Sequence, residues 1–203
     1  TLDRSSAASD VYKRQVQAVL KKAAALDIAM ICPLHGPVLK EDLGHYIDKY
    51  NIWSSYGVES EGVFIAYASV YGNTRKAADM LASKLADKGV HVTVSDLARD
   101  DWAECLEDAF RYGKLVLAAP TYNADVFPAM KEFINHLTER NYQNRTIGII
   151  ENGSWAPMAA KVMKGMFEKS KNITFAENTV TVRSAVNAAN EAQIEALAEE
   201  LKG

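Results

Sequence analysis

A regular alternation of strand-type and helix-type segments, from residue 61 to the end of the chain, most constrains the fold. Short apolar segments rich in β-branched residues predict strands, and apolar residues three or four positions apart predict helices. Strict alternation of the two is typical of α/β proteins with a doubly wound parallel sheet. The predicted strands are Val63–Ala68, Val90–Val94, Leu115–Ala119, Ile147–Ile150 and a fifth, in one piece or split between Ile173–Phe175 and Thr179–Val182.

Five amphipathic helices are predicted between and after these strands. The first begins near Thr74 and ends at Gly89, since glycine commonly terminates a helix. The residues expected on the inner faces are Ala77, Leu81 and Leu85; Trp102, Cys105, Leu106 and Ala109; Met130, Phe133, Ile134 and Leu137; Ala159, Val162, Met163 and Met166; and Ile194, Leu197 and Leu201.

The first 60 residues have a different pattern. Apolar residues from Val16 to Ala23 predict a helix, Ile28–Ile31 a short strand, and Cys32–Pro37 a loop with two prolines and a glycine. A second helix is expected from Leu43 to Trp53. The polar segment Gly57–Gly62 is predicted to be a linker, which places the domain boundary at residues 60 and 61.

Composition narrows the class of protein. Of the 203 residues 48% are hydrophobic and 24% charged, as in an ordinary globular protein. A net charge of −3 gives no electrostatic reason to expect nucleic acid or an anionic membrane as a partner. The two cysteines form no CxxC pair, and apolar runs such as Leu115–Pro120 are far shorter than the roughly 20 residues of a membrane helix. We therefore expect a cytoplasmic protein.

The loop after the first predicted strand has the composition of an anion site. Ser69, Val70, Tyr71, Gly72, Asn73 and Thr74 lead into a helix. The small side chains of Ser69, Asn73 and Thr74 can donate hydrogen bonds, and backbone N–H groups at a helix N-terminus favour a phosphate. Because the loop lacks the GxxxxGK[ST] pattern of nucleoside triphosphatases, it predicts a monophosphate held by neutral donors. The alternative is a tight turn in which Asn73 or Thr74 is only an N-cap.

Two further loops lie at the same predicted edge of the sheet. Each places an aromatic residue among small polar residues, which suits a flat heteroaromatic ring: Tyr122 and Trp155 are expected to stack on its faces. Either aromatic residue alone would more often be a loop anchor. The predicted site residues of these loops are Pro120, Thr121, Tyr122 and Asn123 in the second, and Asn152, Gly153, Ser154 and Trp155 in the third.

These motifs resemble those of a known family. Residues 67–74 are similar to the phosphate loop of flavodoxins, and residues 119–123 to their second FMN loop. With residues 151–157, the resemblance is to the C-terminal domain of flavodiiron proteins, the A-type flavoproteins. It implies a flavodoxin-like five-stranded parallel sheet of order 2-1-3-4-5 over residues 61–203, with FMN as cofactor.

The segment before the linker has its own resemblance. Residues 30–38, with His35, look like the end of the metallo-β-lactamase-like domain of flavodiiron proteins, which implies that residues 16–60 are a remnant of it. In that family the histidine is an iron ligand. The other ligands, including an HxExDH motif, would lie upstream, so di-iron is expected only in an intact parent protein. Residues 1–15 resemble translated adapter sequence, and we expect this leader to be artefactual.

The resemblance implies an FMN-binding electron-transfer domain of an oxygen or nitric oxide reductase. A rubredoxin-like or flavin reductase donor would reduce the FMN, which would pass electrons to a di-iron centre within a head-to-tail homodimer. The chain alone would then only transfer electrons, and no residue of it is expected to be catalytic. Two alternatives remain: a flavodoxin-like NAD(P)H:quinone oxidoreductase, and a cofactor-free association domain.

Overall fold

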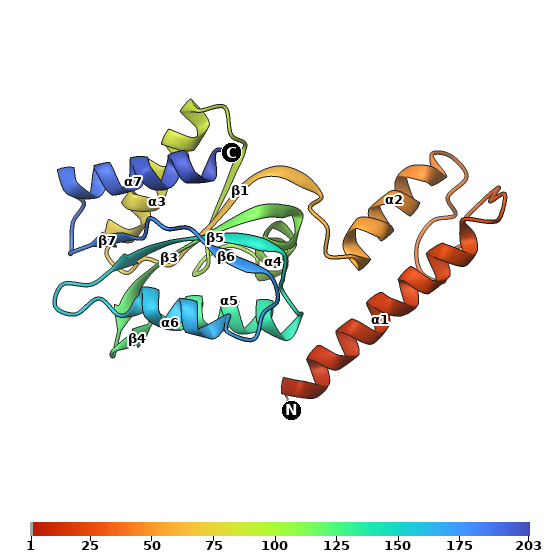
Figure 1. Ribbon diagram of the computed structural model, residues 1–203, viewed down its shortest axis with the longest axis horizontal. Coiled ribbons are helices and arrows are strands. Elements are labelled where there is room, and N and C mark those ends of the chain that lie inside the picture. The colour runs from red at the N-terminus through yellow and green to blue at the C-terminus, as the bar shows by residue number, and fades with distance from the viewer. Residues whose placement is uncertain (1) are drawn as a thin grey trace.

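The computed structural model describes the backbone of residues 2–203 and the side chains from Tyr12 onward. Two N-terminal helices lie to one side of an α/β domain (Figure 1). The helices are α1 (Leu2–Ala23), α2 (Leu43–Ser54), α3 (Asn73–Asp87), α4 (Trp102–Arg111), α5 (Pro128–Glu139), α6 (Ala159–Met166) and α7 (Ala188–Leu201). The strands are β1 (Ser60–Tyr67), β2 (Val92–Asp96), β3 (Tyr112–Tyr122), β4 (Asp125–Val126), β5 (Arg145–Asn152), β6 (Ile173–Phe175) and β7 (Val180–Val182).

The strands form one sheet whose main order is β2-β1-β3-β5-β6. β6 and β7 lie along the same side of β5: β6 pairs with its first residues and β7 with its last residues. All of these pairings are parallel, whereas β4 pairs antiparallel with β3. The predicted order 2-1-3-4-5 is therefore confirmed, with the fifth strand split into β6 and β7. The order reverses between β1 and β3, and doubly wound sheets bind ligands outside the carboxyl ends of the strands at such a point.

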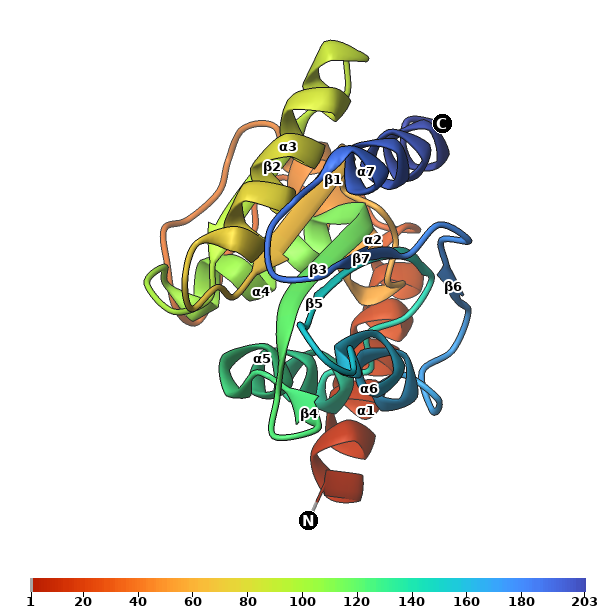
Figure 2. The same cartoon turned by 90° about the vertical axis from the view of Figure 1, so that its left-hand side faces the viewer.

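Helices cover both faces of the sheet (Figures 1 and 2). On one face, α3 and α7 pack through Leu81, Leu85, Ile194 and Leu197 against Ile65 and other inward residues. On the other face, α4, α5 and α6 bury a second core. Because both faces are covered, β1 from Val63 to Tyr67 is apolar and at most 5% exposed at each residue.

A buried arginine ties the segment after α2 to the sheet. Arg145, at the start of β5, is 3% exposed and donates to the carbonyl oxygens of Tyr56 at 2.9 Å, Gly57 at 2.8 Å and Phe110 at 2.7 Å. Its Nε has no partner among the residues that the structure describes. Burial lowers the pKa of Arg145. The guanidinium therefore joins the ends of α2 and α4 to the first residue of β5.

Several predicted boundaries differ from the structure, and in three places the difference changes the kind of element. The expected strand Ile28–Ile31 is reduced to one bridge, in which Ile31 and Leu39 exchange backbone hydrogen bonds of 2.9 Å. The remaining residues of that segment have no strand beside them to complete a ladder. The expected linker Gly57–Gly62 is shorter, since β1 begins at Ser60, where it pairs with Tyr112. The second loop is largely a hairpin, as described below.

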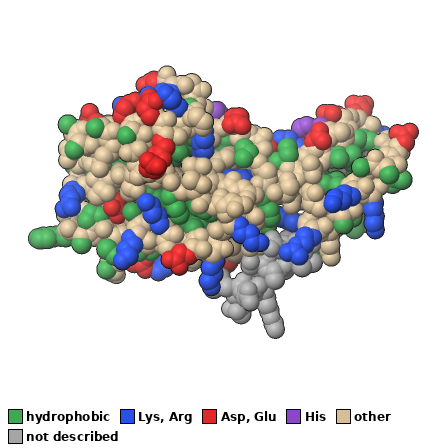
Figure 3. All heavy atoms as spheres, in the orientation of Figure 1, with side chains coloured by type: hydrophobic (Ala, Val, Ile, Leu, Met, Phe, Trp, Pro, Cys, Tyr) green, Lys and Arg blue, Asp and Glu red, His purple; other side chains and the backbone are tan. Residues whose placement is uncertain are grey.

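Acidic and basic side chains are interspersed over the face seen in Figure 3. In the part of the chain that the structure covers, no helix has the length and apolar character needed to cross a membrane.

Candidate functional site

The carboxyl ends of β1, β3 and β5 surround a pocket of about 360 Å³. Most of the residues predicted from the three loops line it: Ser69, Val70, Tyr71, Asn73, Thr74, Pro120, Thr121, Tyr122, Asn152, Gly153 and Ser154. Phe127 and Ser184 also line the pocket and were not predicted. Gly72, Asn123 and Trp155 belong to the same loops but are not part of the lining. The structure thus brings together residues more than 80 positions apart in the sequence.

The first loop ends in an open helix N-terminus. Gly72 occupies the N-cap position of α3 with φ of +86°, and no side chain in the described part of the chain caps the helix. The first N–H bonded within the helix is that of Lys76, which donates to the Gly72 carbonyl at 2.9 Å. The amides of the first turn therefore remain available to an anion. The alternative in which Asn73 or Thr74 serves as the N-cap is wrong, because both residues lie inside α3.

Two hydroxyl groups accompany this helix start. The Ser69 Oγ accepts a hydrogen bond of 3.1 Å from the Gly72 N–H. Thr74 lies in the first turn and is 2% exposed. Both residues line the pocket, so their hydroxyl groups are placed beside the open amides.

The second loop is a β-hairpin. β3 continues to Tyr122, and Thr121 and Tyr122 pair with Val126 and Asp125 of β4. Asn123 and Ala124 form the turn with φ of 50° and 57°. The predicted loop Pro120–Asn123 is largely strand, because β4, a strand of two residues, gives Thr121 and Tyr122 a pairing partner. Tyr122 is 50% exposed, and its ring meets that of Phe127 edge-on at 5.9 Å.

The third loop is tied to the segment after β7. Asn152 donates from its amide to the Ser184 carbonyl at 3.1 Å and accepts from the Ser184 N–H at 3.2 Å. The hydroxyl groups of Ser154 and Ser184 lie 2.7 Å apart, and the Gly153 N–H donates to the Val182 carbonyl at 3.0 Å. These bonds hold the loop from Asn152 to Ser154 against the segment after β7.

Thr121 and Glu151 hold the far end of this loop. The Thr121 Oγ accepts from the N–H groups of Met158 at 2.9 Å and Ala159 at 3.1 Å. Glu151, 7% exposed, accepts from the Ala160 N–H at 2.9 Å. Glu151 was not predicted as a site residue. The available signal was an acidic residue at the end of an otherwise apolar strand.

The expected aromatic pair is only half in place. Tyr122 lines the pocket, whereas Trp155 is 95% exposed and lies outside it. Tyr71, on the first loop, lines the pocket and is 91% exposed. In this structure Tyr122 and Trp155 therefore do not face each other across a space that could hold a flat ring.

A tyrosine directly before the first loop stays protonated. Burial raises the pKa of Tyr67, and the carboxylate of Asp96, its register partner on β2, raises it further. Asp96 itself accepts from Arg99 at 2.5 Å and from the Ala98 N–H at 3.0 Å. The side chain at the end of β1 is thus neutral, close to the open amides at the start of α3.

His35 lies far from the pocket in sequence, in the exposed turn between Ile31 and Leu39. Within the described residues, no three His, Cys, Asp or Glu side chains are grouped so that they could hold a metal ion. The role of His35 as an iron ligand in an intact parent protein stays a prediction.

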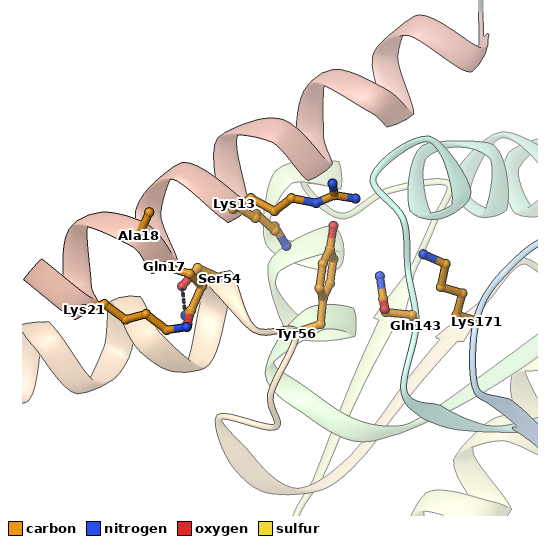
Figure 4. Close-up of a pocket in the computed structure, with 9 residues that line it drawn as sticks. Lys13, Gln17, Ala18, Lys21, Ser54, Tyr56, Gln143 and Lys171 are labelled. Atoms are coloured by element: carbon orange, nitrogen blue, oxygen red, sulfur yellow. Dashed lines mark hydrogen bonds between the residues drawn. The ribbon is translucent and has the colours of Figure 1, made fainter.

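A second pocket of about 360 Å³ lies between α1, α2 and the α/β domain (Figure 4). Tyr56, Gln143 and Lys171 contribute to it from segments that precede β1, β5 and β6, so it lies at the amino-terminal edge of the sheet. Lys13 lies 3.5 Å from the centre of the Tyr56 ring. Ligands of doubly wound sheets bind at the opposite edge, so the first pocket is the candidate site.

Comparison with known proteins agrees with this architecture. A family model described as a flavodoxin domain matches residues 64–183. The anaerobic nitric oxide reductase flavorubredoxin of Aeromonas hydrophila is 27% identical over 132 residues, which are 64% of this chain and 26% of that protein.

Solved structures show the same fold. Rubredoxin oxygen:oxidoreductase from Desulfovibrio gigas superimposes with a TM-score of 0.84 at 19% identity, over 94% of this chain and 48% of that one. A mutant flavo di-iron protein from Thermotoga maritima gives a TM-score of 0.79 at 22% identity, again over 94% of this chain and 48% of that one. The chain spans less than half the length of each of these three proteins. Because the family model covers more than half of the chain, the protein belongs to the flavodoxin domain family, and its structural neighbours include flavodiiron proteins.

Proposed function

We propose that the pocket at the carboxyl ends of β1, β3 and β5 binds FMN. The observation that carries the proposal is the uncapped N-terminus of α3, where Gly72 replaces a capping side chain beside the hydroxyl groups of Ser69 and Thr74. Neutral donors at a helix N-terminus suit a phosphate monoester. The family relationship supports the same ligand.

Different residues would bind the phosphate and the ring of the cofactor. Ser69, Asn73, Thr74 and the first amides of α3 would hold the phosphate. Tyr122 would contact the isoalloxazine ring, and the loop from Gly153 would form another wall of its site. Trp155, now exposed, would have to turn toward the pocket to cover the ring. Bound FMN would supply one- and two-electron transfer, while these residues orient it and limit its contact with water.

The wider proposal is that the chain is the electron-transfer domain of a flavodiiron oxygen or nitric oxide reductase. The names of the relatives support it, since one is a nitric oxide reductase flavorubredoxin and another a rubredoxin oxygen:oxidoreductase. A rubredoxin-like protein or a flavin reductase would donate the electrons. The FMN would pass them to a di-iron centre that His35 helps to hold in the intact parent, within a head-to-tail homodimer.

FMN titration of the purified chain tests the first proposal. We expect saturable binding, seen as a change in the visible flavin spectrum and quenching of flavin fluorescence. Riboflavin, which has the ring but no phosphate, should bind much more weakly because it cannot use the α3 amides. A protein that binds neither compound would contradict the proposal and favour a cofactor-free association domain.

A further inference from the structure

The start of α6 is capped by side chains from two strands instead of by its own N-cap residue. Met158, at the N-cap position, makes no capping hydrogen bond through its side chain. Thr121 accepts from the amides of Met158 and Ala159, and Glu151 accepts from the amide of Ala160. Three successive N–H groups are thus bonded to the ends of β3 and β5.

The Glu151 carboxylate is held entirely by neutral donors. One oxygen accepts from the Ala160 amide, and the other accepts from the Thr181 hydroxyl at 2.9 Å. Among the ion pairs of the described residues, none includes Glu151. With 7% of the residue exposed, its negative charge is screened mainly by these two donors and by the positive end of α6.

This charge lies next to the wall of the candidate site. Asn152, the next residue along β5, lines the pocket. Thr121 also lines it, and Thr121 and Glu151 accept hydrogen bonds from neighbouring amides at the start of α6. Charges in a partly buried setting interact more strongly than in water. The Glu151 carboxylate, buried behind the pocket wall, is therefore placed to act electrostatically on a ligand in the pocket.

We propose that the buried Glu151 carboxylate lowers the reduction potential of a flavin bound in this pocket. The inference rests on the proposed FMN site. Two electrons and one proton convert the oxidised ring into a reduced ring with one additional negative charge. A nearby carboxylate disfavours that charge, so reduced FMN binds less tightly relative to oxidised FMN.

Three variants test this role. Glu151→Gln removes the charge but keeps an oxygen that can accept from the Ala160 amide. Thr181→Val keeps the charge and removes one of its two donors. Glu200→Gln is the matched control, because Glu200 also accepts from backbone amides, at 2.5 Å from Glu177 and 3.1 Å from Asn178, but lies near the C-terminus of α7. The measurements are FMN affinity and an anaerobic reductive titration with dithionite and reference dyes at pH 8.

We expect Glu151→Gln to strengthen the binding of reduced FMN, relative to oxidised FMN, by roughly 10-fold. Thr181→Val should change the same ratio in the opposite direction, because the carboxylate is then less neutralised. Glu200→Gln should leave the ratio unchanged. A role of Glu151 in packing alone would not produce opposite shifts from these two substitutions.

The inference is overturned if the wild type binds FMN and Glu151→Gln gives the same ratio as Glu200→Gln. Circular dichroism and the affinity for oxidised FMN will show whether Glu151→Gln retains the fold. If it does not, Thr181→Val decides, and an unchanged ratio in that variant contradicts the proposal. Absence of FMN binding by the wild type would instead contradict the proposed function itself.

Discussion

The hydroxyl oxygen of Ser69 accepts a hydrogen bond of 3.1 Å from the backbone N–H of Gly72, which closes the loop between β1 and α3 on itself. Because this bond uses a lone pair, the hydroxyl hydrogen of Ser69 remains available to another acceptor. The pocket lies beside it. The first prediction follows from this arrangement.

Ser69→Ala and Thr74→Val should each weaken FMN binding by about 1–3 kcal/mol, because a phosphate oxygen loses a donor. Isothermal titration calorimetry of the two variants measures the loss. Riboflavin is the control ligand, and its affinity should be insensitive to the Ser69 substitution. If neither variant changes the affinity for FMN, the phosphate does not bind at the start of α3.

Gly72→Ala should destabilise the protein by about 1 kcal/mol, because an L-residue is strained at the φ of +86°. A new Cβ would meet nothing within 4 Å, so no steric clash adds to this cost. Gly165→Ala is the matched control in α6, where a new Cβ also meets nothing within 4 Å and the φ is not in the left-handed region. It should stabilise the protein by about 0.5–1 kcal/mol. Urea unfolding measures both, and a stabilising Gly72→Ala would contradict the prediction.

Arg145→Met should cost about 2–4 kcal/mol of unfolding free energy, because buried carbonyl groups of Tyr56, Gly57 and Phe110 lose their donor. Arg140→Met removes an exposed guanidinium that donates to the His136 carbonyl one helical turn earlier, and it should cost less than about 0.5 kcal/mol. Equal losses for the two variants would show that Arg145 does not fasten the segment after α2.

Stability should fall in acid partly through Glu195 of α7, which pairs at 2.6 Å each with Lys84 of α3 and with Lys88, the C-cap residue of that helix. These hydrogen-bonded ammonium groups lower the pKa of Glu195 from 4.5 to about 2. A lowered pKa stabilises the fold above the unfolded value, and the contribution is lost as the pH falls from 4.5 through about 2. Glu195→Gln should therefore reduce the dependence of unfolding free energy on pH in this range.

Ionic strength provides the control for that prediction, because exposed ion pairs are screened by salt. In 1 M NaCl the wild type and Glu195→Gln should have similar pH dependence.

At the alkaline end, Glu195 and Glu199 raise the pKa of Lys88 from 10.5 to about 12. The corresponding stabilisation is present below 10.5 and is lost as the pH rises through about 12.

Trp155→Ala should leave the unfolding free energy of the FMN-free protein within about 0.5 kcal/mol of wild type, since the side chain is 95% exposed. If the indole stacks on bound FMN, the variant should bind FMN more weakly and shift its potentials. FMN should also quench tryptophan emission more strongly in the wild type than in the variant, which retains Trp53 and Trp102. Equal quenching and equal affinity would place Trp155 away from the ring.

The sheet was predictable because its signals are local. Both faces of β1, β3 and β5 are covered by helices, which requires apolar runs such as Leu115–Ala119 and makes them easy to recognise. The loops of the site were predictable for a related reason: each follows directly on such a strand. Capping is local in the same way: Asp101, the residue before Trp102, is the N-cap of α4 and accepts from the Ala103 N–H at 2.7 Å.

What the sequence did not reveal depends on contacts between distant segments. β4 exists because Asp125 and Val126 meet the end of β3, and two residues are too few to form a recognisable pattern. Ser184 joins the site through Asn152 and Ser154, 32 and 30 positions away. The segment Ile28–Ile31 shows the opposite error, a strand that was predicted and is not formed. Its apolar pattern is typical of a strand, but only Ile31 pairs with another backbone segment, at Leu39.

The capping of α6 by Thr121 and Glu151 determines which mutations the loop before this helix can accept. Because Thr121 and Glu151 bond to the amides of residues 158–160, the helix start is fixed by the strands and not by the residues that lead up to it. Residues 154–156 can therefore exchange one side chain for another without moving α6. An added or deleted residue there must be absorbed before Met158, so the position of α6 depends on the length of this loop and not on its side chains.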